Sequence, residues 1–294
     1  MIITRLKGGM GNQMFQYAIG RAMAIKYEVT LGLDLSSLLD RNPRPEFYSF
    51  TYRNYDLDVF NIKATIVPEL SIPFFYRPFK SKLVFLFAHF YRKTFKLPGV
   101  EKMPGFDSKI LNVGPDAYLD GRWLSPKYFS NIEDTIRADF TLKDELPEKI
   151  RILRKEIIEK KSLCIHVRRG DFIGDPKRDV VGSEYYNAAI ERVKSKTEID
   201  CIYLFSDDIK WCEENLSFPY PTIFVGQEYA GKKAEGHLAL MSACHNFIIP
   251  NSSFAWWAAW LNPSKTKIVI VPEKWFGNRD ISSNDLIPWG WISM

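Results

Sequence analysis

The sequence predicts an α/β protein whose C-terminal half is a doubly wound domain with a parallel sheet. Short apolar runs alternate with helix-like segments over most of the 294 residues, and in the second half these runs are continuously apolar. Continuous apolar strands separated by helices are typical of a parallel sheet that is covered on both faces. Ligands of such domains bind at the carboxyl ends of the strands.

The N-terminal half begins with a predicted strand at 2–6, a glycine loop and a helix. Apolar residues recur at spacings of three and four from about 12 to 26, which predicts an amphipathic helix. A second strand is expected at 29–33, and 34–60 is expected to be loop with short elements. The loop Gly8-Gly9-Met10-Gly11 is neither GxGxxG nor a P-loop, but it allows close approach of the backbone to a ligand.

Residues 72–97 form a basic, aromatic stretch. No acidic residue occurs between Glu69 and Glu101, and lysines and arginines are interleaved with phenylalanines. Two interpretations follow: an amphipathic helix that covers the first domain, or a surface that lies on an anionic membrane. The strongly apolar part, 83–91, is too short to span a bilayer, which needs roughly 20 residues in a helix.

A helix at 147–161 is predicted to connect two domains, which we therefore expect at 1–146 and 147–294. The apolar runs beyond it predict five strands, with helices in the gaps between them. These predicted strands are 163–167, 201–205, 222–225, 246–249 and 267–271.

Composition and cysteine spacing favour a cytoplasmic globular protein. Lys and Arg number 40 against 35 Asp and Glu, and the pI near 8.8 is below the range typical of nucleic-acid-binding domains. The N-terminal segment has no apolar h-region, so we expect no signal peptide. Cys164, Cys201, Cys212 and Cys244 have neither CxxC nor zinc-ligand spacing, so we expect buried, reduced thiols.

The first of three polar loops after predicted strands is His166-Val-Arg-Arg-Gly-Asp171. Each arginine presents a planar fork of donors that matches phosphate oxygens. We expect at least one of Arg168 and Arg169 to contact a phosphate and the other to brace the loop. Pairing of an arginine with Asp171 is the purely structural interpretation.

The other two loops are Ser206-Asp207-Asp208 and Asn251-Ser252-Ser253. In the second loop, a side chain either caps the following helix or accepts hydrogen bonds from a nucleobase or ribose. The third loop opens a helix, where hydroxyls and backbone N–H groups can bind an anion. The tryptophans of that helix, Trp256, Trp257 and Trp260, are expected to pack in the core rather than to bind a sugar.

These motifs resemble the α-1,2-fucosyltransferases of glycosyltransferase family 11. The resemblance extends over nearly the whole chain and rests on GGMGNQMFQYAIGRAMA at 8–24, YDLDVF at 55–60, HVRRGD at 166–171, FSDD at 205–208 and NSSFAWWAAWL at 251–261. It implies a GT-B-like fold, with two Rossmann-like domains facing across a cleft. The C-terminal domain would bind GDP-fucose and the N-terminal domain the acceptor.

The implied reaction is an inverting transfer of L-fucose to the 2-hydroxyl of a terminal β-galactoside, without a metal or other cofactor. The resemblance carries Arg168 over as the phosphate ligand. Negative charge grows on the β-phosphate as its bond to fucose breaks, so a fixed guanidinium stabilises the transition state more than the ground state. The other donor-binding positions implied by the resemblance are Asn12, His166, Arg169, Asp207, Asp208, Ser252, Ser253 and Phe254.

A catalytic base is sought among nearby carboxylates, because an inverting displacement usually needs one to take the acceptor proton. Asp171 and Asp175 are the candidates, and Asp171 is better suited to hold Arg168 or Arg169. A loose transition state can also proceed with a weak base. Glu235 stands where the family usually has an acidic residue before an apolar helix.

The expected partners are GDP-fucose and a galactose-terminated glycan, with no nucleic acid. Peripheral contact with the inner face of an anionic membrane through 72–97 is the further expectation. The Asp56-Leu57-Asp58 pattern lies in the N-terminal half, so we expect no metal at the diphosphate. The alternative functions are another GDP-sugar transferase, such as a protein O-fucosyltransferase, and a non-catalytic basic binding protein.

Overall fold

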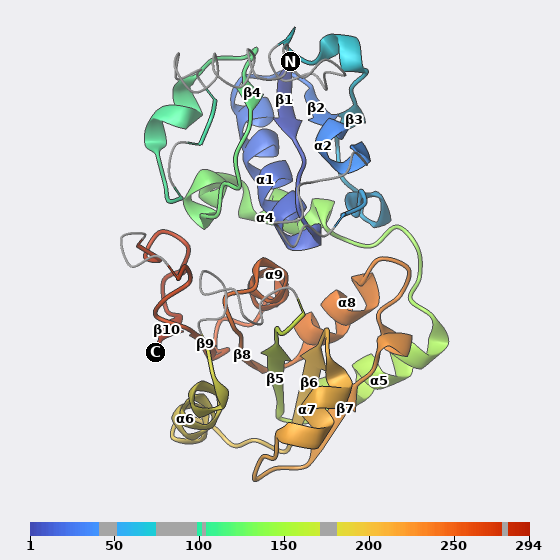
Figure 1. Cartoon of the computed structure of the whole chain (residues 1–294), viewed down its shortest axis with the longest axis vertical. Coiled ribbons are helices and arrows are strands. Elements are labelled where there is room, and N and C mark those ends of the chain that lie inside the picture. Colours follow the sequence, from blue (N-terminus) through green and yellow to red (C-terminus); the bar gives the residue numbers. More distant parts are fainter. Residues whose placement is uncertain (41–51, 75–98, 102–103, 171–180, 278–281) are drawn as a thin grey trace, which may run out of the picture. The chain divides into compact units, whose positions relative to one another are not determined.

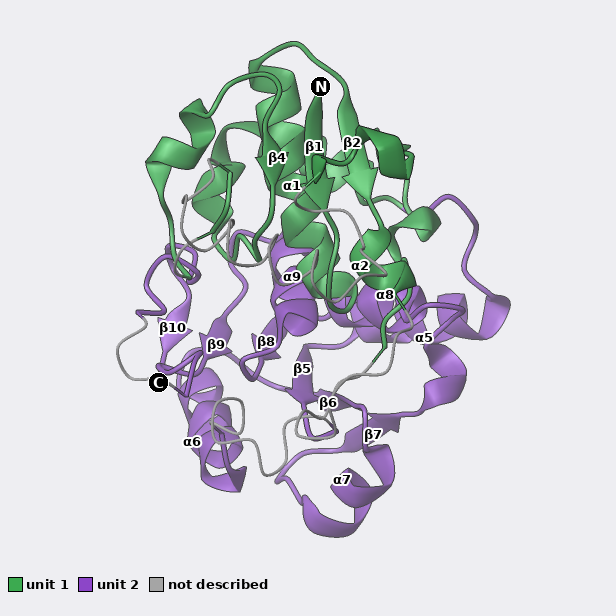
Figure 2. Ribbon diagram, turned by 45° about the horizontal axis from the view of Figure 1, so that its top comes forward, with its two compact units in different colours: residues 1–141 green, residues 142–294 purple. Residues whose placement is uncertain are grey.

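The computed structural model describes residues 1–40, 52–74, 99–101, 104–170, 181–277 and 282–294 (Figure 1). These residues divide into two compact units, Met1–Thr141 and Leu142–Met294 (Figure 2). The division falls between helices α4 (Glu133–Asp139) and α5 (Glu148–Glu159), a few residues before the boundary that the sequence predicts. Most of the basic stretch at 72–97, from residue 75 onward, lies outside the described residues.

Unit 1 contains a four-stranded parallel sheet in the order β3-β2-β1-β4. The predicted first strand and the helix after it are confirmed, and β2 corresponds to the strand expected at 29–33. The glycine loop is shorter than predicted, because α1 begins at Met10 and includes Gly11 in its first turn. Because β1, β2 and β3 run to one side of the sheet and β4 lies on the other, the strand order reverses between β1 and β4. Its strands and helices are β1 (Ile2–Arg5), α1 (Met10–Lys26), β2 (Leu31–Asp34), α2 (Ser36–Leu39), β3 (Thr65–Ile66), β4 (Tyr118–Leu119) and α4. Short 3-10 helices lie at Leu57–Val59, Glu69–Ser71, Ser108–Asn112, Pro126–Tyr128 and Ser130–Ile132.

Helix α1 is the central element of unit 1. The sequence predicts an amphipathic helix, but 13 of its 17 residues are buried, including the polar Gln13 and Gln16. The loops around residues 57–59 and 126–128 pack against it, which explains why more than one face is covered. Gly20 permits close packing on the sheet, since a Cβ there would collide with Thr4 and Leu31.

Unit 2 contains a six-stranded parallel sheet in the order β10-β9-β8-β5-β6-β7. This is the doubly wound order, in which the chain runs outward in one direction and then returns to continue in the other. The five predicted strands are confirmed; β10, with two residues, is too short to be recognised in the sequence. Its elements are α5, β5 (Ser162–Val167), α6 (Ser183–Lys194), β6 (Cys201–Ser206), α7 (Ile209–Asn215), β7 (Thr222–Val225), α8 (Glu235–Ala243), β8 (Asn246–Ile248), α9 (Ser253–Leu261), β9 (Val269–Val271) and β10 (Ile292–Ser293), with a 3-10 helix at Gln227–Tyr229.

The two faces of the unit 2 sheet have different surroundings. Along β5, Leu163, Ile165 and Val167 belong to one core cluster with residues of α6 and α7. The alternate residues Cys164 and His166 therefore lie on the opposite face. Both faces of the strand are buried, which is why apolar residues occupy both faces rather than alternating with polar ones.

Two expectations about the core are confirmed. All four cysteines are free and buried. The three tryptophans of α9 are also buried and contact one another, with Trp256 stacked on Trp260 and its indole N–H donating to the Leu286 carbonyl oxygen. They pack the core, as predicted, rather than forming a sugar-binding platform.

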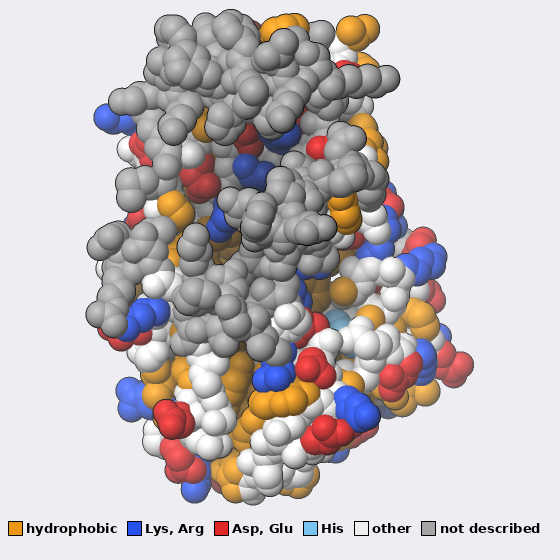
Figure 3. Space-filling view, viewed as in Figure 1, with side chains coloured by type: hydrophobic (Ala, Val, Ile, Leu, Met, Phe, Trp, Pro, Cys, Tyr) orange, Lys and Arg blue, Asp and Glu red, His pale blue; other side chains and the backbone are white. Residues whose placement is uncertain are grey.

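The described surface gives two further observations. On the face shown in Figure 3, basic and acidic side chains of unit 2 are interspersed rather than gathered into one basic patch. None of the described helices is long and apolar enough to cross a membrane.

Candidate active site

The three predicted loops meet at one edge of the unit 2 sheet. Strands β5 and β8 are neighbours with Ile165 opposite Ile248, and the strand order reverses between them. Strand β6 lies on the other side of β5, with Val167 opposite Ser206. The residues after β5, β6 and β8 therefore lie at the carboxyl ends of three adjacent strands, where open α/β sheets bind ligands.

Arg169 is held from three directions. Its backbone N–H donates to Asp207 Oδ1 at 2.9 Å, and its Nε donates to Asp208 Oδ2 at 3.4 Å. Its guanidinium carbon lies 3.3 Å from the ring centroid of Trp211, a cation–π contact. Arg169 is therefore the arginine that braces the loop.

Arg168 is paired with Asp207, whose Oδ2 lies 3.1 Å from Nη1. Asp207 thus joins the side chain of Arg168 to the backbone of Arg169. Gly170 permits this arrangement, because a Cβ there would collide with the Asp207 carboxylate. The sequence predicts Asp171 as the brace, but Asp171 and Asp175 lie outside the described residues; among the described carboxylates, Asp207 and Asp208 hold the arginines.

Asp208 also caps α7, which confirms the capping interpretation for this residue. Its Oδ1 accepts from the backbone N–H of Trp211 at 3.3 Å, and its own N–H donates to Ser206 Oγ at 3.0 Å. A carboxylate has about four lone-pair sites. Asp208 and Asp207 therefore retain capacity to accept hydrogen bonds from a ligand.

His166, the penultimate residue of β5, is a buried neutral histidine. The centroids of the His166 and Phe254 rings are 6.3 Å apart. The Nδ1 atom of His166 has no hydrogen-bond partner among the described residues. Its backbone carbonyl accepts from the Tyr186 hydroxyl at 3.2 Å. Burial, with the positive charge of Arg168 and the nearby His237, lowers the pKa of His166 to about 3. A neutral imidazole offers one donor and one acceptor to a bound molecule.

The loop after β8 ends in a capped helix. Ser252 Oγ accepts from the backbone N–H of Ala255 at 3.4 Å, and Ser252 is 7% exposed. Its hydroxyl hydrogen can still donate to an anion. Ser253 and Phe254, both half-buried, form the first turn of α9, where the helix dipole favours negative charge.

Two predicted positions have other surroundings. Asn12 lies in the first turn of α1 in unit 1, against Gly8, whose φ of +81° suits glycine. The structure therefore places it in a different unit from the other predicted donor-binding residues. Glu235 begins α8 and accepts backbone N–H groups of Lys232 at 2.9 Å and Lys233 at 2.6 Å, so it stabilises the turn before the helix.

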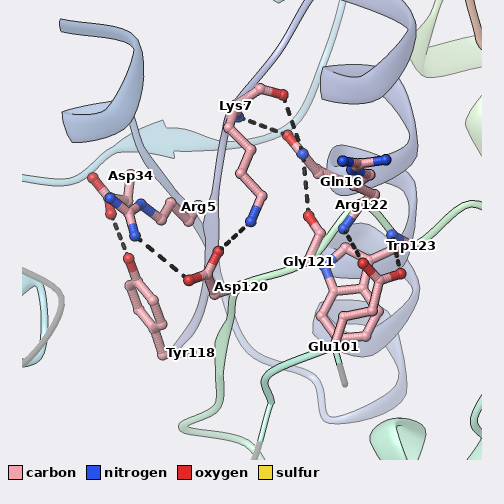
Figure 4. A network of polar contacts seen from close by, with 10 residues as sticks. All are labelled: Arg5, Lys7, Gln16, Asp34, Glu101, Tyr118, Asp120, Gly121, Arg122 and Trp123. Atoms are coloured by element: carbon pink, nitrogen blue, oxygen red, sulfur yellow. Dashed lines mark hydrogen bonds and ion pairs between the residues drawn. The ribbon is translucent and has the colours of Figure 1, made fainter. Parts of the chain in front are cut away.

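The carboxyl end of the unit 1 sheet carries a second polar cluster, which the sequence does not reveal (Figure 4). Asp120, after β4, accepts from Lys7 Nζ at 2.7 Å and from Arg5 Nη1 at 3.5 Å. Tyr118 donates to the buried Asp34 at 2.5 Å. The two residues of each of these pairs lie more than 80 positions apart in the chain, so no local motif indicates the cluster. The sequence analysis also does not predict the contact of Trp211 with Arg169 in unit 2. An aromatic residue in the first turn after Asp208 could have indicated it.

Asp56 of the acidic pattern lies beside the glycine loop of unit 1. Gln13 accepts from its backbone N–H at 2.9 Å and donates to the Gly8 carbonyl oxygen at 2.9 Å. Within the part of the chain that the structure describes, no group of three or more His, Cys, Asp or Glu is arranged to hold a metal ion.

Comparisons with known proteins identify a family. The model of glycosyl transferase family 11 matches residues 60–294. The O-antigen biosynthesis glycosyltransferase WbnK of Escherichia coli is 30% identical, over 97% of this chain and 98% of its own. The alpha-1,2-colitosyltransferase of Escherichia coli is 28% identical, over 99% and 98%. The galactoside alpha-(1,2)-fucosyltransferase 1 of Leontocebus fuscicollis is 30% identical, over 50% of this chain and 43% of its own.

Among solved structures, fucosyltransferase NodZ from Bradyrhizobium superposes with a TM-score of 0.56, covering 89% of this chain and 92% of its own, at 18% identity. At that identity the likeness concerns the fold. The predicted fold class, a GT-B-like α/β protein with two Rossmann-like units, is confirmed. The family match over most of the chain and the near full-length relatives lead to one conclusion: this chain is an enzyme of glycosyltransferase family 11.

Proposed function

We propose that the enzyme transfers L-fucose from GDP-fucose to the 2-hydroxyl of a terminal β-galactoside, with inversion at the fucose anomeric carbon. The observation that carries the proposal is Arg168 at the carboxyl end of β5, braced by Asp207 beside the strand-order reversal. The family and the α-1,2 linkage named for two relatives support the reaction type and position.

In this mechanism Arg168 binds the diphosphate. As the bond between the fucose anomeric carbon and the β-phosphate oxygen breaks, its electron pair stays on that oxygen. A guanidinium that is already in place stabilises the growing charge, and a single such donor contributes roughly 3 kcal/mol to the lowering of the barrier. Asp207 acts as a positioning residue, because its second oxygen anchors the neighbouring Arg169 backbone.

The remaining donor contacts come from the same sheet edge. We assign the nucleoside to the neutral His166 and to Phe254, which lie near each other, and the pyrophosphate to the first turn of α9 with the Ser252 hydroxyl. The acceptor 2-hydroxyl attacks from the face opposite the leaving diphosphate, and a carboxylate takes its proton. Asp171 and Asp175 are the candidates for that base. Unit 1, with Asn12, is the acceptor side.

A second donor is favoured by one relative, the alpha-1,2-colitosyltransferase. Colitose is fucose without its 3-hydroxyl, so the same diphosphate site would serve GDP-colitose. The comparisons favour neither a protein O-fucosyltransferase nor a non-catalytic binding protein.

The test is a product-linkage assay with GDP-fucose and GDP-colitose on Gal-β1,3 and Gal-β1,4 acceptors. We expect an α-1,2-linked fucosyl product, with GDP-fucose giving the higher kcat/KM. A faster reaction with GDP-colitose would show that GDP-colitose is the preferred donor, and the proposed diphosphate site would stay the same. In thermal-shift measurements GDP should stabilise the enzyme selectively over GMP, UDP and short RNA; equal stabilisation by UDP would contradict the nucleotide assignment.

We also propose peripheral contact with an anionic membrane on the cytoplasmic side, through residues 72–97. The support is the sequence composition of this stretch. Binding to anionic vesicles should be weak and should disappear as salt is raised, since exposed charges are screened over about 8–10 Å near physiological ionic strength. No co-sedimentation at low salt would contradict the contact.

A further inference from the structure

The four residues after β4 form a loop that is held along its whole length (Figure 4). Asp120 pairs with Lys7 and Arg5. The Gly121 carbonyl oxygen accepts from Gln16 Nε2 at 3.1 Å, and the same glutamine exchanges two hydrogen bonds with the Lys7 backbone, at 2.9 and 3.2 Å. The loop is therefore joined to the carboxyl end of β1 and to helix α1.

Glu101 fixes the other end of this loop. Its carboxylate accepts the backbone N–H of Arg122 at 2.7 Å and that of Trp123 at 3.0 Å. Charge-assisted hydrogen bonds to two successive amides hold the backbone in one conformation. A Cβ at position 121 would collide with Glu101 and with the Trp123 ring, so the turn requires glycine there.

Trp123 adopts a backbone conformation that such a residue rarely takes. Its φ is +59°, one of three positive values outside glycine in the described chain. Its side chain is fully buried against Tyr128, with ring centroids 5.6 Å apart. Strained backbone that is fixed by its surroundings is concentrated at ligand-binding sites.

Within this loop, Arg122 alone is exposed. Figure 4 shows its guanidinium pointing away from Glu101, on the side of Gln16. The Arg122 guanidinium makes no ion pair or hydrogen bond with any residue that the structure describes, whereas the side chains of Lys7 and Arg5 both pair with Asp120. Arg122 is thus a cation with no ion-pair partner among the described residues, on a loop that is fixed at the carboxyl edge of a parallel sheet, where such sheets bind ligands.

We propose that Arg122 contacts the acceptor and selects glycans that carry an oxyanion, either a sugar carboxylate or a phosphate, near the galactose. A guanidinium matches the geometry of both groups and can donate two parallel hydrogen bonds to either. Glu101 is a positioning residue, because it holds the backbone of Arg122 in place. This inference rests on the proposed function, since it names a property of the acceptor for the same reaction.

The test compares kcat/KM for three galactosides: a neutral one, one extended with a uronic acid, and one with a reducing-end phosphate. Wild-type enzyme should prefer at least one acidic acceptor by about tenfold over the neutral one, the factor expected for one charged hydrogen-bonded contact. The ratio should fall to about one in Arg122→Gln and Arg122→Ala. Which acid is preferred distinguishes the carboxylate from the phosphate.

Two further variants separate contact from structure. Arg151→Ala removes an exposed arginine of α5 and should keep the wild-type ratio. Glu101→Gln retains Arg122 but loses one of the two backbone bonds; it should lower the ratio through KM for the acidic acceptor, with KM for GDP-fucose unchanged. A wild-type ratio near one, or a ratio that survives in Arg122→Gln, would overturn the proposal.

Direct binding keeps this test separate from the proposed function. Calorimetry with the acidic galactosides should give tighter binding to wild type than to Arg122→Gln, whether or not sugar is transferred. Absence of transfer to every acceptor would contradict the proposed function. Equal binding of the acidic galactosides by the two proteins would contradict the role of Arg122.

Discussion

The two units present the same kind of sheet edge with different charge. In both, the strand order reverses, and polar side chains follow the strands on either side of the reversal. In unit 1 two cations, Arg5 and Lys7, share the single carboxylate of Asp120. In unit 2 two adjacent arginines are held by two adjacent carboxylates, next to the N-terminus of α9.

This difference shows what topology does and does not decide. A parallel sheet brings loops together at its carboxyl edge whatever their residues are. The chemistry depends on which donors the loops carry and how they are fixed. Unit 2 adds a helix N-terminus and a buried neutral histidine, a set suited to a nucleotide diphosphate. Unit 1 instead uses the buried Gln13 and Gln16 to organise its loops.

The largest expected effect separates the two arginines of unit 2. Arg168→Lys should lower kcat by about 100-fold or more, because a point charge does not replace a planar fork at the developing anion. Arg169→Lys should act first on stability, lowering the free energy of unfolding by about 1 kcal/mol through loss of the Trp211 contact. Steady-state kinetics and urea unfolding measure the two effects; Arg168→Lys with more than about a third of the wild-type rate would remove Arg168 from the site.

Acid sensitivity should come from unit 2, through His166. Its pKa is lowered by burial to about 3, against about 6.5 in an unfolded chain. Between these values the unfolded chain binds a proton that the folded protein excludes, so the free energy of unfolding falls as the pH drops below about 6.5. At pH 5 the loss from this residue is about 2 kcal/mol.

The measurement is urea unfolding of wild type and His166→Asn at pH 7.5 and pH 5. The variant should lose less stability on acidification than wild type. Some acid sensitivity should remain, because burial also lowers the pKa of His237. Identical losses in the two proteins would show that His166 is protonated in the folded state.

A smaller effect is expected for Asp207, and it distinguishes a residue that holds Arg168 from one that accepts hydrogen bonds from the nucleobase. Asp207→Asn keeps the shape but weakens the ion pair, so kcat should fall about tenfold, an intermediate loss that corresponds to roughly 1.4 kcal/mol. The preference for GDP over IDP, which lacks the 2-amino group, should stay as in wild type. A selective loss of that preference would assign Asp207 to guanine instead.

The smallest expected effect is that of removing divalent metal. If the unit 2 arginines neutralise the leaving diphosphate, turnover should persist in excess EDTA, and added Mg²⁺ should change the rate only modestly. The Asp56-Leu57-Asp58 pattern of unit 1 is the rival device, since metal-dependent transferases hold a cation between acidic residues and the diphosphate. Inactivation by EDTA with full recovery in Mg²⁺ or Mn²⁺ would favour it and overturn the role of Arg168.

Local patterns were sufficient for much of unit 2. Its five longer strands are mostly apolar, and the inner strands β5, β6 and β8 are buried along their whole length. The polar loops follow these strands directly, so the sequence indicates both the sheet edge and the candidate residues. The capping role of Asp208 follows from its place between strand and helix. Helix α1 shows the opposite case: spacing indicates one buried face, but tertiary packing buries Gln13 and Gln16 as well.

The sequence by itself determined the α/β class, the strands of the second unit and the loops that carry the proposed donor-site residues, because strand burial and loop position are local properties. Only the tertiary structure decided the partners. That Asp207 and Asp208 hold the two arginines depends on β6 lying beside β5, and that Glu101 fixes Arg122 depends on a segment about twenty residues away folding back onto the loop. Hydrogen-bond partners distant in the chain leave no periodic trace in it, since each is chosen by the packing of the whole unit.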